Sequence, residues 1–157
     1  MERTIEKAKN YAFLLLRYRL RTKKEIAERL LKKNFTEKQV EEVIVFLVDL
    51  EYLDDLKFAQ LWVKDRLRGK PRSKRFLSYE LEKKGVPREI AEKVLETVTE
   101  QIEFEAAKSF AQAKLKSLKK YDKLIAKRRM FGYLQRRGFN AHINYRIINE
   151  LMDKDEK

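Results

Sequence analysis

The sequence is short of the residues on which many enzyme and metal sites depend. Its 157 residues include no cysteine and a single histidine, His142. The lack of cysteine excludes disulfides, thiol catalysis and cysteine-based zinc sites. One histidine cannot build a multi-histidine metal site by itself. We therefore expect a protein that binds rather than catalyses, with no catalytic residues, no metal and no cofactor.

Turn residues and long apolar runs are also scarce. The chain has four glycines and two prolines, while 43% of its residues are hydrophobic and 40% are charged. This balance favours long helices over a β-rich fold, which usually needs more turn residues. The longest apolar run near the N-terminus, residues 12–16, is far shorter than the roughly 20 residues of a membrane-spanning helix. The first residues carry no cleavable apolar signal, so we expect a cytoplasmic protein with no membrane association.

Acidic residues are fewer than basic ones. The chain carries 38 lysines and arginines against 25 aspartates and glutamates, for a formal net charge of +13. A charge of this size favours a polyanionic partner such as nucleic acid, or an acidic protein surface.

One pattern recurs three times, anchored at Phe35, Val86 and Phe139, which lie 51 and 53 residues apart. Each anchor has a leucine five residues before it and an asparagine or glycine immediately before it. Apolar residues follow it at eight, nine and twelve residues. The leucines are Leu30, Leu81 and Leu134; the adjacent residues are Asn34, Gly85 and Gly138; and the apolar positions are Val43, Ile44 and Leu47, then Val94, Leu95 and Val98, then Ile147, Ile148 and Leu151.

The repeated pattern describes two helices joined by a turn. Asparagine and glycine accept the left-handed backbone that ends many helices. Signals for a new helix follow: a capping box from Thr36 to Gln39, Pro87 at a first helical position, and Asn140 as an N-cap. A further helix precedes each pair, so each copy should contain three helices.

We therefore predict an all-α fold of three tandem three-helix repeats, over residues 1–53, 54–102 and 103–157. A repeat of this size buries only a marginal core alone, and stacking on its neighbours would bury more. The expected shape is an elongated, curved rod; a single compact bundle that arose by duplication is the alternative.

Basic residues gather in three clusters, one in each repeat. The densest stretch, residues 108–137, holds eleven basic residues and one acidic residue. Such clusters suit an extended polyanion, although a basic helical face is often simply solvated. The candidate residues for binding a partner or DNA are Arg17, Arg19, Arg21, Arg66, Arg68, Lys70, Arg72, Lys74, Arg75, Lys116, Lys119, Lys120, Lys123, Lys127, Arg128, Arg129, Arg136 and Arg137.

Other conspicuous residues are interpreted as structural. Asp54 and Asp55 lie where a helix should begin, and aspartate caps helix N-termini well. His142 should be an exposed or partly packed helix residue. The aromatic residues at first-helix positions should belong to the core; they are Tyr11, Phe13, Phe58, Trp62 and Phe110. A helix-turn-helix DNA-binding protein is a weaker interpretation, since no copy stands out as a recognition unit.

The motifs resemble those of a known family. Residues 51–59, Glu-Tyr-Leu-Asp-Asp-Leu-Lys-Phe-Ala, are similar to the most recognisable signature of RecX proteins. Arg66, Gly69, Pro71 and Arg72, followed by residues 80–86, resemble the family's second repeat, and residues 136–139, Arg-Arg-Gly-Phe, its third. Lys24-Glu25-Ile26 and Phe35 fit the first repeat, where Asn34 stands in place of a common glycine.

This resemblance implies a function. RecX proteins bind the RecA recombinase along the groove of its filament on single-stranded DNA. They typically inhibit strand exchange, ATP hydrolysis and LexA cleavage, and so damp DNA repair by homologous recombination and the SOS response. We accordingly expect a monomer that binds the RecA filament and either single- or double-stranded DNA. The alternative is a basic helical protein that acts directly on DNA without RecA.

Overall fold

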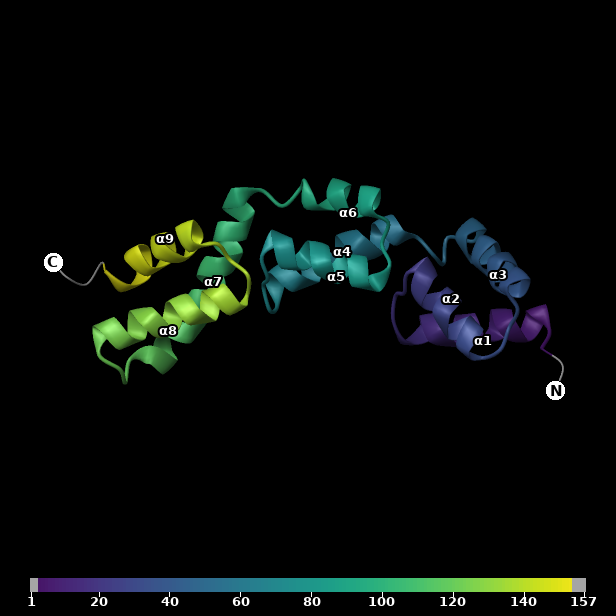
Figure 1. Cartoon of the computed structure of the whole chain (residues 1–157), viewed down its shortest axis with the longest axis horizontal. Helices are drawn as coiled ribbons and strands as arrows, with labels where there is room; N and C mark the ends of the chain where they lie inside the picture. Colours follow the sequence, from purple (N-terminus) through teal and green to yellow (C-terminus); the bar gives the residue numbers. More distant parts are fainter. Residues whose placement is uncertain (1–2, 154–157) are drawn as a thin grey trace. The chain divides into compact units, whose positions relative to one another are not determined.

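The computed structural model describes residues 3–153, which form an all-α fold. Over this range the chain forms nine helices and no strand (Figure 1). The helices are α1 (Ile5–Tyr18), α2 (Lys23–Lys32), α3 (Glu37–Asp49), α4 (Asp55–Arg68), α5 (Lys74–Lys84), α6 (Arg88–Leu95), α7 (Glu100–Leu118), α8 (Lys123–Arg136) and α9 (Ala141–Met152). The predicted all-α repeat fold is confirmed. None of the helices in the described residues is long and apolar enough to cross a bilayer.

The second helix of every repeat ends in the same left-handed turn. Asn34, Gly85 and Gly138 have φ values of 68°, 88° and 89°. The next residue's N–H donates to the leucine carbonyl five positions earlier, and the left-handed residue's own N–H donates to a carbonyl three positions earlier. These paired bonds define a Schellman motif. The bonds to the leucines are Phe35 to Leu30 (3.2 Å), Val86 to Leu81 (3.0 Å) and Phe139 to Leu134 (3.2 Å).

The third helix of each repeat starts as the sequence indicates, with one small shift. Thr36 and Gln39 form a reciprocal capping box, and the Asn140 side chain accepts a hydrogen bond from the Ile143 N–H. Pro87 lies one residue before the first residue of α6, and its carbonyl accepts the first helical bond, from Ala91. Pro87 therefore occupies the cap position and not the predicted first helical position.

The predicted core positions are buried. The leucines and anchors of the pattern are at most 5% exposed in all three repeats. Of the apolar positions that follow them, Ile44 and Leu151 are partly buried and the others are fully buried. One cluster links α1, α2 and α3, and another links α7, α8 and α9.

By its internal packing the chain divides into two compact units, and the boundary between them runs through the second repeat. The first unit takes in the described residues up to Leu61 together with Glu80–Val94. The second takes in Trp62–Tyr79 and the described residues from Leu95 onward. The helices α4 and α5 each contribute to both units. The second repeat is therefore shared between its neighbours, and the two repeat boundaries, at residues 53 and 102, stay predictions.

In the first unit, the start of α2 packs against the glycine turn that follows α5. The Thr22 hydroxyl donates to the Lys84 carbonyl at 2.5 Å, and the Lys23 N–H donates to a carboxylate oxygen of Asp55 at 3.0 Å. Thr22 and Asp55 are both buried. A Cβ on Gly85 would overlap the Lys24 side chain. We call this arrangement the first joint.

The second unit repeats this arrangement one repeat later. The start of α5 packs against the glycine turn that follows α8: the Ser73 N–H donates to the Arg137 carbonyl at 3.0 Å. The Lys74 N–H donates to a carboxylate oxygen of Glu103, near the start of α7, at 3.4 Å. A Cβ on Gly138 would lie 2.5 Å from the Ser73 hydroxyl oxygen and 2.9 Å from the Phe76 ring. Ser73 and Arg137 of this second joint correspond in the repeat to Thr22 and Lys84 of the first, although the donor is a backbone N–H here and a hydroxyl there.

Replacing Gly138 by alanine should weaken the second joint. The left-handed backbone and the contact with Ser73 together should lower the free energy of unfolding by about 1–3 kcal/mol. Gly132 is a matched control within α8, where an added Cβ would meet nothing closer than the Arg136 guanidinium at 3.4 Å. Gly132→Ala should raise the free energy of unfolding by about 0.5–1 kcal/mol, as alanine usually does in a helix interior. Urea denaturation followed by circular dichroism measures both; equal effects of the same sign would contradict the proposed role of the turn.

The Glu25 carboxylate is a titratable group that contacts residues of the first joint. Its carboxylate pairs with Arg19, lies 3.7 Å from the Lys84 ammonium, and accepts from the Thr22 N–H at 3.2 Å. Burial alone would raise the pKa of Glu25, but the hydrogen bonds from Arg19 and Thr22 and the charges of Arg19 and Lys84 lower it overall. Burial raises the pKa of Asp55, and the hydrogen bond from Lys23 only partly offsets this rise. The pKa of Asp55 is therefore shifted in the direction opposite to that of Glu25.

Glu25→Gln should lower the free energy of unfolding at pH 7 by about 0.5–1.5 kcal/mol, because the amide keeps an acceptor but loses the charge. The carboxylate's lowered pKa stabilises the folded state above the ordinary glutamate pKa of about 4.3, and this stability is lost as pH falls through the lowered folded value. The difference in the free energy of unfolding between the variant and the parent should therefore shrink below pH about 4. Urea denaturation at several pH values measures it, with Glu28→Gln as the exposed control on the same helix. A difference that stays constant down to pH 3 would show that the Glu25 charge is not responsible.

Candidate nucleic-acid interface

The first basic cluster, around the end of α1, is largely engaged in internal contacts. Arg19 forms the ion pair with Glu25, and the Arg21 guanidinium donates to the Leu15 carbonyl at 3.2 Å. Burial, followed by the charge of Arg19, lowers the pKa of Arg21. Arg17 is exposed in the last turn of α1. Two of the three candidate arginines in this cluster thus help to hold the first unit together.

In the third repeat, acidic residues from the end of the chain neutralise part of the basic stretch. Asp153 pairs with Lys127 and lies 3.9 Å from Lys123, while Glu150 pairs with Lys108 at 3.3 Å. The candidates that remain exposed are Lys116, Lys119, Lys120, Arg128, Arg129 and Arg136. Arg129 and Lys120 both lie over the Tyr121 ring, at 4.2 and 5.3 Å. The local charge is therefore lower than the count along residues 108–137 indicates.

Within the second unit, Arg72 of the second basic cluster lies near Arg136 and Arg137 of the third. Arg72, in the loop before α5, lines a pocket of about 340 Å³ with Arg136 and Arg137 from the end of α8. The other lining residues are Phe110 and Lys114 of α7 and Tyr133 of α8. We call these six residues the arginine pocket; none of them is acidic. Arg68, Lys70, Lys74 and Arg75 are exposed around the same loop, and Arg66 lies over the Trp62 ring.

Aromatic rings hold the cations of the arginine pocket in place. The Lys114 ammonium lies 5.7 Å from both the Phe110 and the Tyr133 ring centres. The Arg137 guanidinium lies 5.0 Å from Phe110, and that of Arg136 lies 5.3 Å from Tyr133. These distances fall within the range of cation–π attraction, which restrains a cation without neutralising its charge.

The cations of this region also repel one another. The pKa of Arg137 is lowered first by burial and then by the charges of Arg72 and Arg66. The second joint imposes this crowding, because the Arg137 carbonyl bonds to Ser73, the residue after Arg72. A bound anion would relieve the repulsion, so the arrangement is suited to hold one.

Of the six pocket residues, the sequence alone singles out Arg72, Arg136 and Arg137 as candidates for binding. Lys114 belongs to the basic stretch but is not among those candidates. Phe110 is predicted to belong to the core, and it does pack partly against that core. Tyr133 is missed, although its spacing of three and four residues from Arg136 and Arg137 places all three on one side of the helix end.

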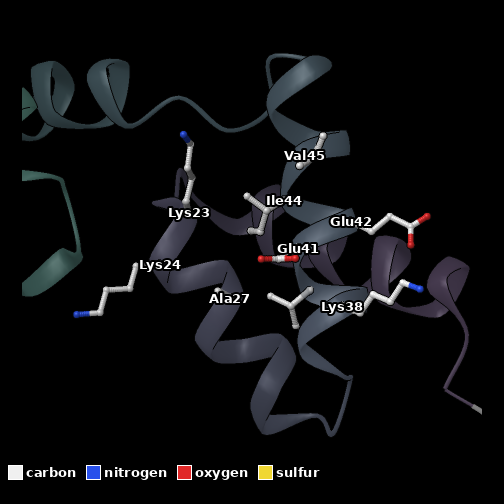
Figure 2. Close-up of a pocket in the computed structure, with 9 residues that line it drawn as sticks. Lys23, Lys24, Ala27, Lys38, Glu41, Glu42, Ile44 and Val45 are labelled. Atoms are coloured by element: carbon white, nitrogen blue, oxygen red, sulfur yellow. The ribbon is translucent and has the colours of Figure 1, made fainter.

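A second depression lies in the first unit, between α2 and α3. Its volume is about 900 Å³, and its lining includes Ala27, Ile44 and the 59% exposed Val45. Figure 2 shows Ala27 and Ile44 facing the same space, with Lys23 and Lys24 at the N-terminal end of α2. Charges of both signs surround it, since Glu41 and Glu42 complete the lining together with Val40 and Lys38.

The other residues singled out in the sequence have structural positions. Asp54 accepts the Lys57 N–H at the start of α4, as predicted, whereas Asp55 binds the start of α2. His142 is exposed on α9, and among the predicted core aromatics Phe58 is fully buried while Tyr11, Phe13 and Trp62 are partly buried. Within residues 3–153 no group of three or more histidine, aspartate or glutamate side chains is arranged to hold a metal ion.

Comparison with known proteins identifies related sequences over most of the chain. Residues 8–47, 54–95 and 101–148 match, in order, the first, second and third three-helix domains of RecX. "Regulatory protein RecX" of Amycolatopsis mediterranei is 34% identical, over 95% of this chain and 85% of the relative. The protein of the same name from Prosthecochloris aestuarii is 33% identical, over 93% and 94%. The crystal structure of RecX from Lactobacillus salivarius superposes with a TM-score of 0.79 at 27% identity, over 94% of this chain and 96% of that chain.

Proposed function

The chain belongs to the RecX family, and on that premise we propose that it is a regulator of the RecA recombinase. It binds along the RecA filament on single-stranded DNA and inhibits ATP hydrolysis, strand exchange and LexA cleavage. Its role is non-enzymatic, its compartment is the cytoplasm, and its effect is to damp recombination and the SOS response.

The observation that carries this proposal is the match of all three family domains, in order, over the chain. The repeated joints support it, because they show that the family's sequence motifs have a defined structural role. Gly85 and Gly138 form the turns. The adjacent Lys84 and Arg137 carbonyls accept hydrogen bonds from the start of the preceding repeat's second helix. The motifs therefore tie one repeat to the next within each unit.

Basic clusters recur with the repeats and supply the contacts. Each cluster precedes the left-handed turn of its own repeat, at Asn34, Gly85 or Gly138, so the clusters recur at regular intervals along the sequence. Several weak contacts of this kind act together only on an assembled filament, where the second and third contacts form at high effective concentration. Free RecA should bind less tightly for the same reason.

Hydrolysis of ATP by RecA on single-stranded DNA tests the proposal directly. The protein, titrated at levels well below RecA, should slow hydrolysis, because one molecule bound to the filament affects the assembly and not a single protomer. Binding to DNA alone should be much weaker than binding to the filament. No effect on hydrolysis together with tight, salt-sensitive DNA binding would favour the alternative, a DNA-binding protein that acts without RecA.

Charge reversal tests the exposed cations of the third repeat. Reversal of Lys119, Lys120, Arg128 and Arg129 to glutamate should weaken filament binding by at least tenfold at moderate salt, since four attractive contacts become repulsive. The control carries the same change in charge at exposed lysines outside the three clusters: Lys32, Lys38, Lys57 and Lys93. Equal losses in the two variants, measured by co-sedimentation with the filament, would mean that net charge alone determines binding.

A further inference from the structure

We propose that the arginine pocket is a phosphate-binding site that takes the phosphodiester backbone of single-stranded DNA. This inference goes beyond the proposed function, because the contact is made to DNA itself and needs no RecA. The pocket brings Arg72, Lys114, Arg136 and Arg137 around about 340 Å³ of space, with no acidic residue in its lining.

The chemistry of the cations suits phosphate. A guanidinium presents several N–H donors in a fixed plane that matches two phosphate oxygens at once. Three of the four cations are arginines, and the lysine adds a compact charge from a separate helix, α7. Cations that the fold already holds together lose little freedom on binding, so the pocket is preorganised for an anion.

The number of charges favours nucleic acid over an acidic protein surface. One carboxylate would neutralise one of the four cations. A DNA strand carries one negative charge on every nucleotide, so a few successive phosphates present several charges to the same cluster of cations. The exposed Lys70, Lys74 and Arg75 lie near Arg72 in sequence and extend the basic surface for the adjacent phosphates.

The aromatic residues act on the cations and not on the bases. Both rings have cations over them: Tyr133 has Lys114 and Arg136, and Phe110 has Lys114 and Arg137. A ring in this position restrains the cation while leaving its outer donors for a ligand. The site should therefore bind DNA with little dependence on base sequence, as expected for contacts to phosphate.

The test uses the full chain and a fluorescein-labelled oligothymidylate without RecA, with fluorescence anisotropy recorded at several salt concentrations. The pocket variant combines Lys114→Gln, Arg136→Gln and Arg137→Gln. The control variant combines Lys116→Gln, Lys119→Gln and Arg128→Gln, which removes the same charge from exposed positions on and next to the same two helices. Circular dichroism and thermal unfolding confirm that both variants are folded.

The pocket variant should bind the oligonucleotide at least tenfold more weakly than the control variant. Its plot of log affinity against log salt should be shallower than that of the parent by about 2. Three cations are removed, and each phosphate contact to a single strand contributes about 0.7 to the slope. Equal losses of affinity and slope in the two variants would overturn the proposal, because the binding would then depend on diffuse charge and not on the pocket.

Two further measurements distinguish a preorganised phosphate pocket from a loose group of cations and from a site for an acidic protein. Tyr133→Ala should weaken binding several-fold with an unchanged salt slope, because the charges remain but lose their restraint, while Tyr133→Phe should restore it. A fluorescent polyglutamate peptide of matched charge should bind the parent and pocket variant almost equally. A large loss for the peptide with no loss for DNA would assign the pocket to an acidic protein partner and overturn the proposal.

The same variants separate this proposal from the regulatory one. If the pocket variant loses DNA binding but still inhibits RecA at substoichiometric levels, both proposals hold and inhibition does not depend on the pocket. If DNA binding depends on the pocket and RecA is unaffected even by the parent protein, the regulatory proposal fails and the phosphate site stands.

Discussion

The left-handed turn after the second helix of each repeat is the feature on which the rest of the structure depends. It ends one helix and directs the next, and at Gly85 and Gly138 it also leaves a surface without a Cβ. The start of the preceding repeat's second helix occupies that surface, with Lys24 against Gly85 in one unit and Ser73 against Gly138 in the other. The same backbone conformation thus ends a helix locally and makes room for a tertiary contact with another helix. Asn34, which belongs to the first repeat, performs only the local task among the contacts seen in the described residues.

This dual role accounts for which parts of the fold the sequence predicts. Leucine, left-handed residue and apolar anchor are neighbours in the chain, so their pattern predicts the turns, the helix order and the core. The joints pair residues that are distant in sequence, such as Thr22 with Lys84, and no local pattern marks such pairs. The sequence predicts that Asp54 and Asp55 both serve the start of their own helix. Asp54 does cap α4, whereas the Asp55 carboxylate accepts the Lys23 N–H at the start of α2. Glu51 adopts a φ of 65° at the end of α3, a conformation that its residue type does not indicate.

The candidate interface is predictable in composition but not in arrangement. Counting along the chain locates the basic stretch, yet it does not show that Asp153 reaches Lys127 or that Glu150 reaches Lys108. It also does not show that the second joint places Arg72 and Arg137 in one pocket. The expected curved rod likewise stays a prediction, because it depends on how the repeats stack and not on the pattern within each repeat. Charge count therefore predicts the class of partner, and tertiary contacts determine which cations are available to it.

The regulatory proposal and the phosphate-site proposal are compatible. The arginine pocket would supply affinity for DNA, and the joint action of several repeats would supply the preference for the filament. A pocket that reads phosphate through cations held by Phe110 and Tyr133 cannot distinguish one DNA sequence from another. A regulator that acts wherever a filament forms has no need of base recognition, but it must still prefer filament to bare DNA. That preference has to come from several repeats engaging one filament together. The glycine turns contribute to that joint engagement, because each ties one repeat to the next within its unit.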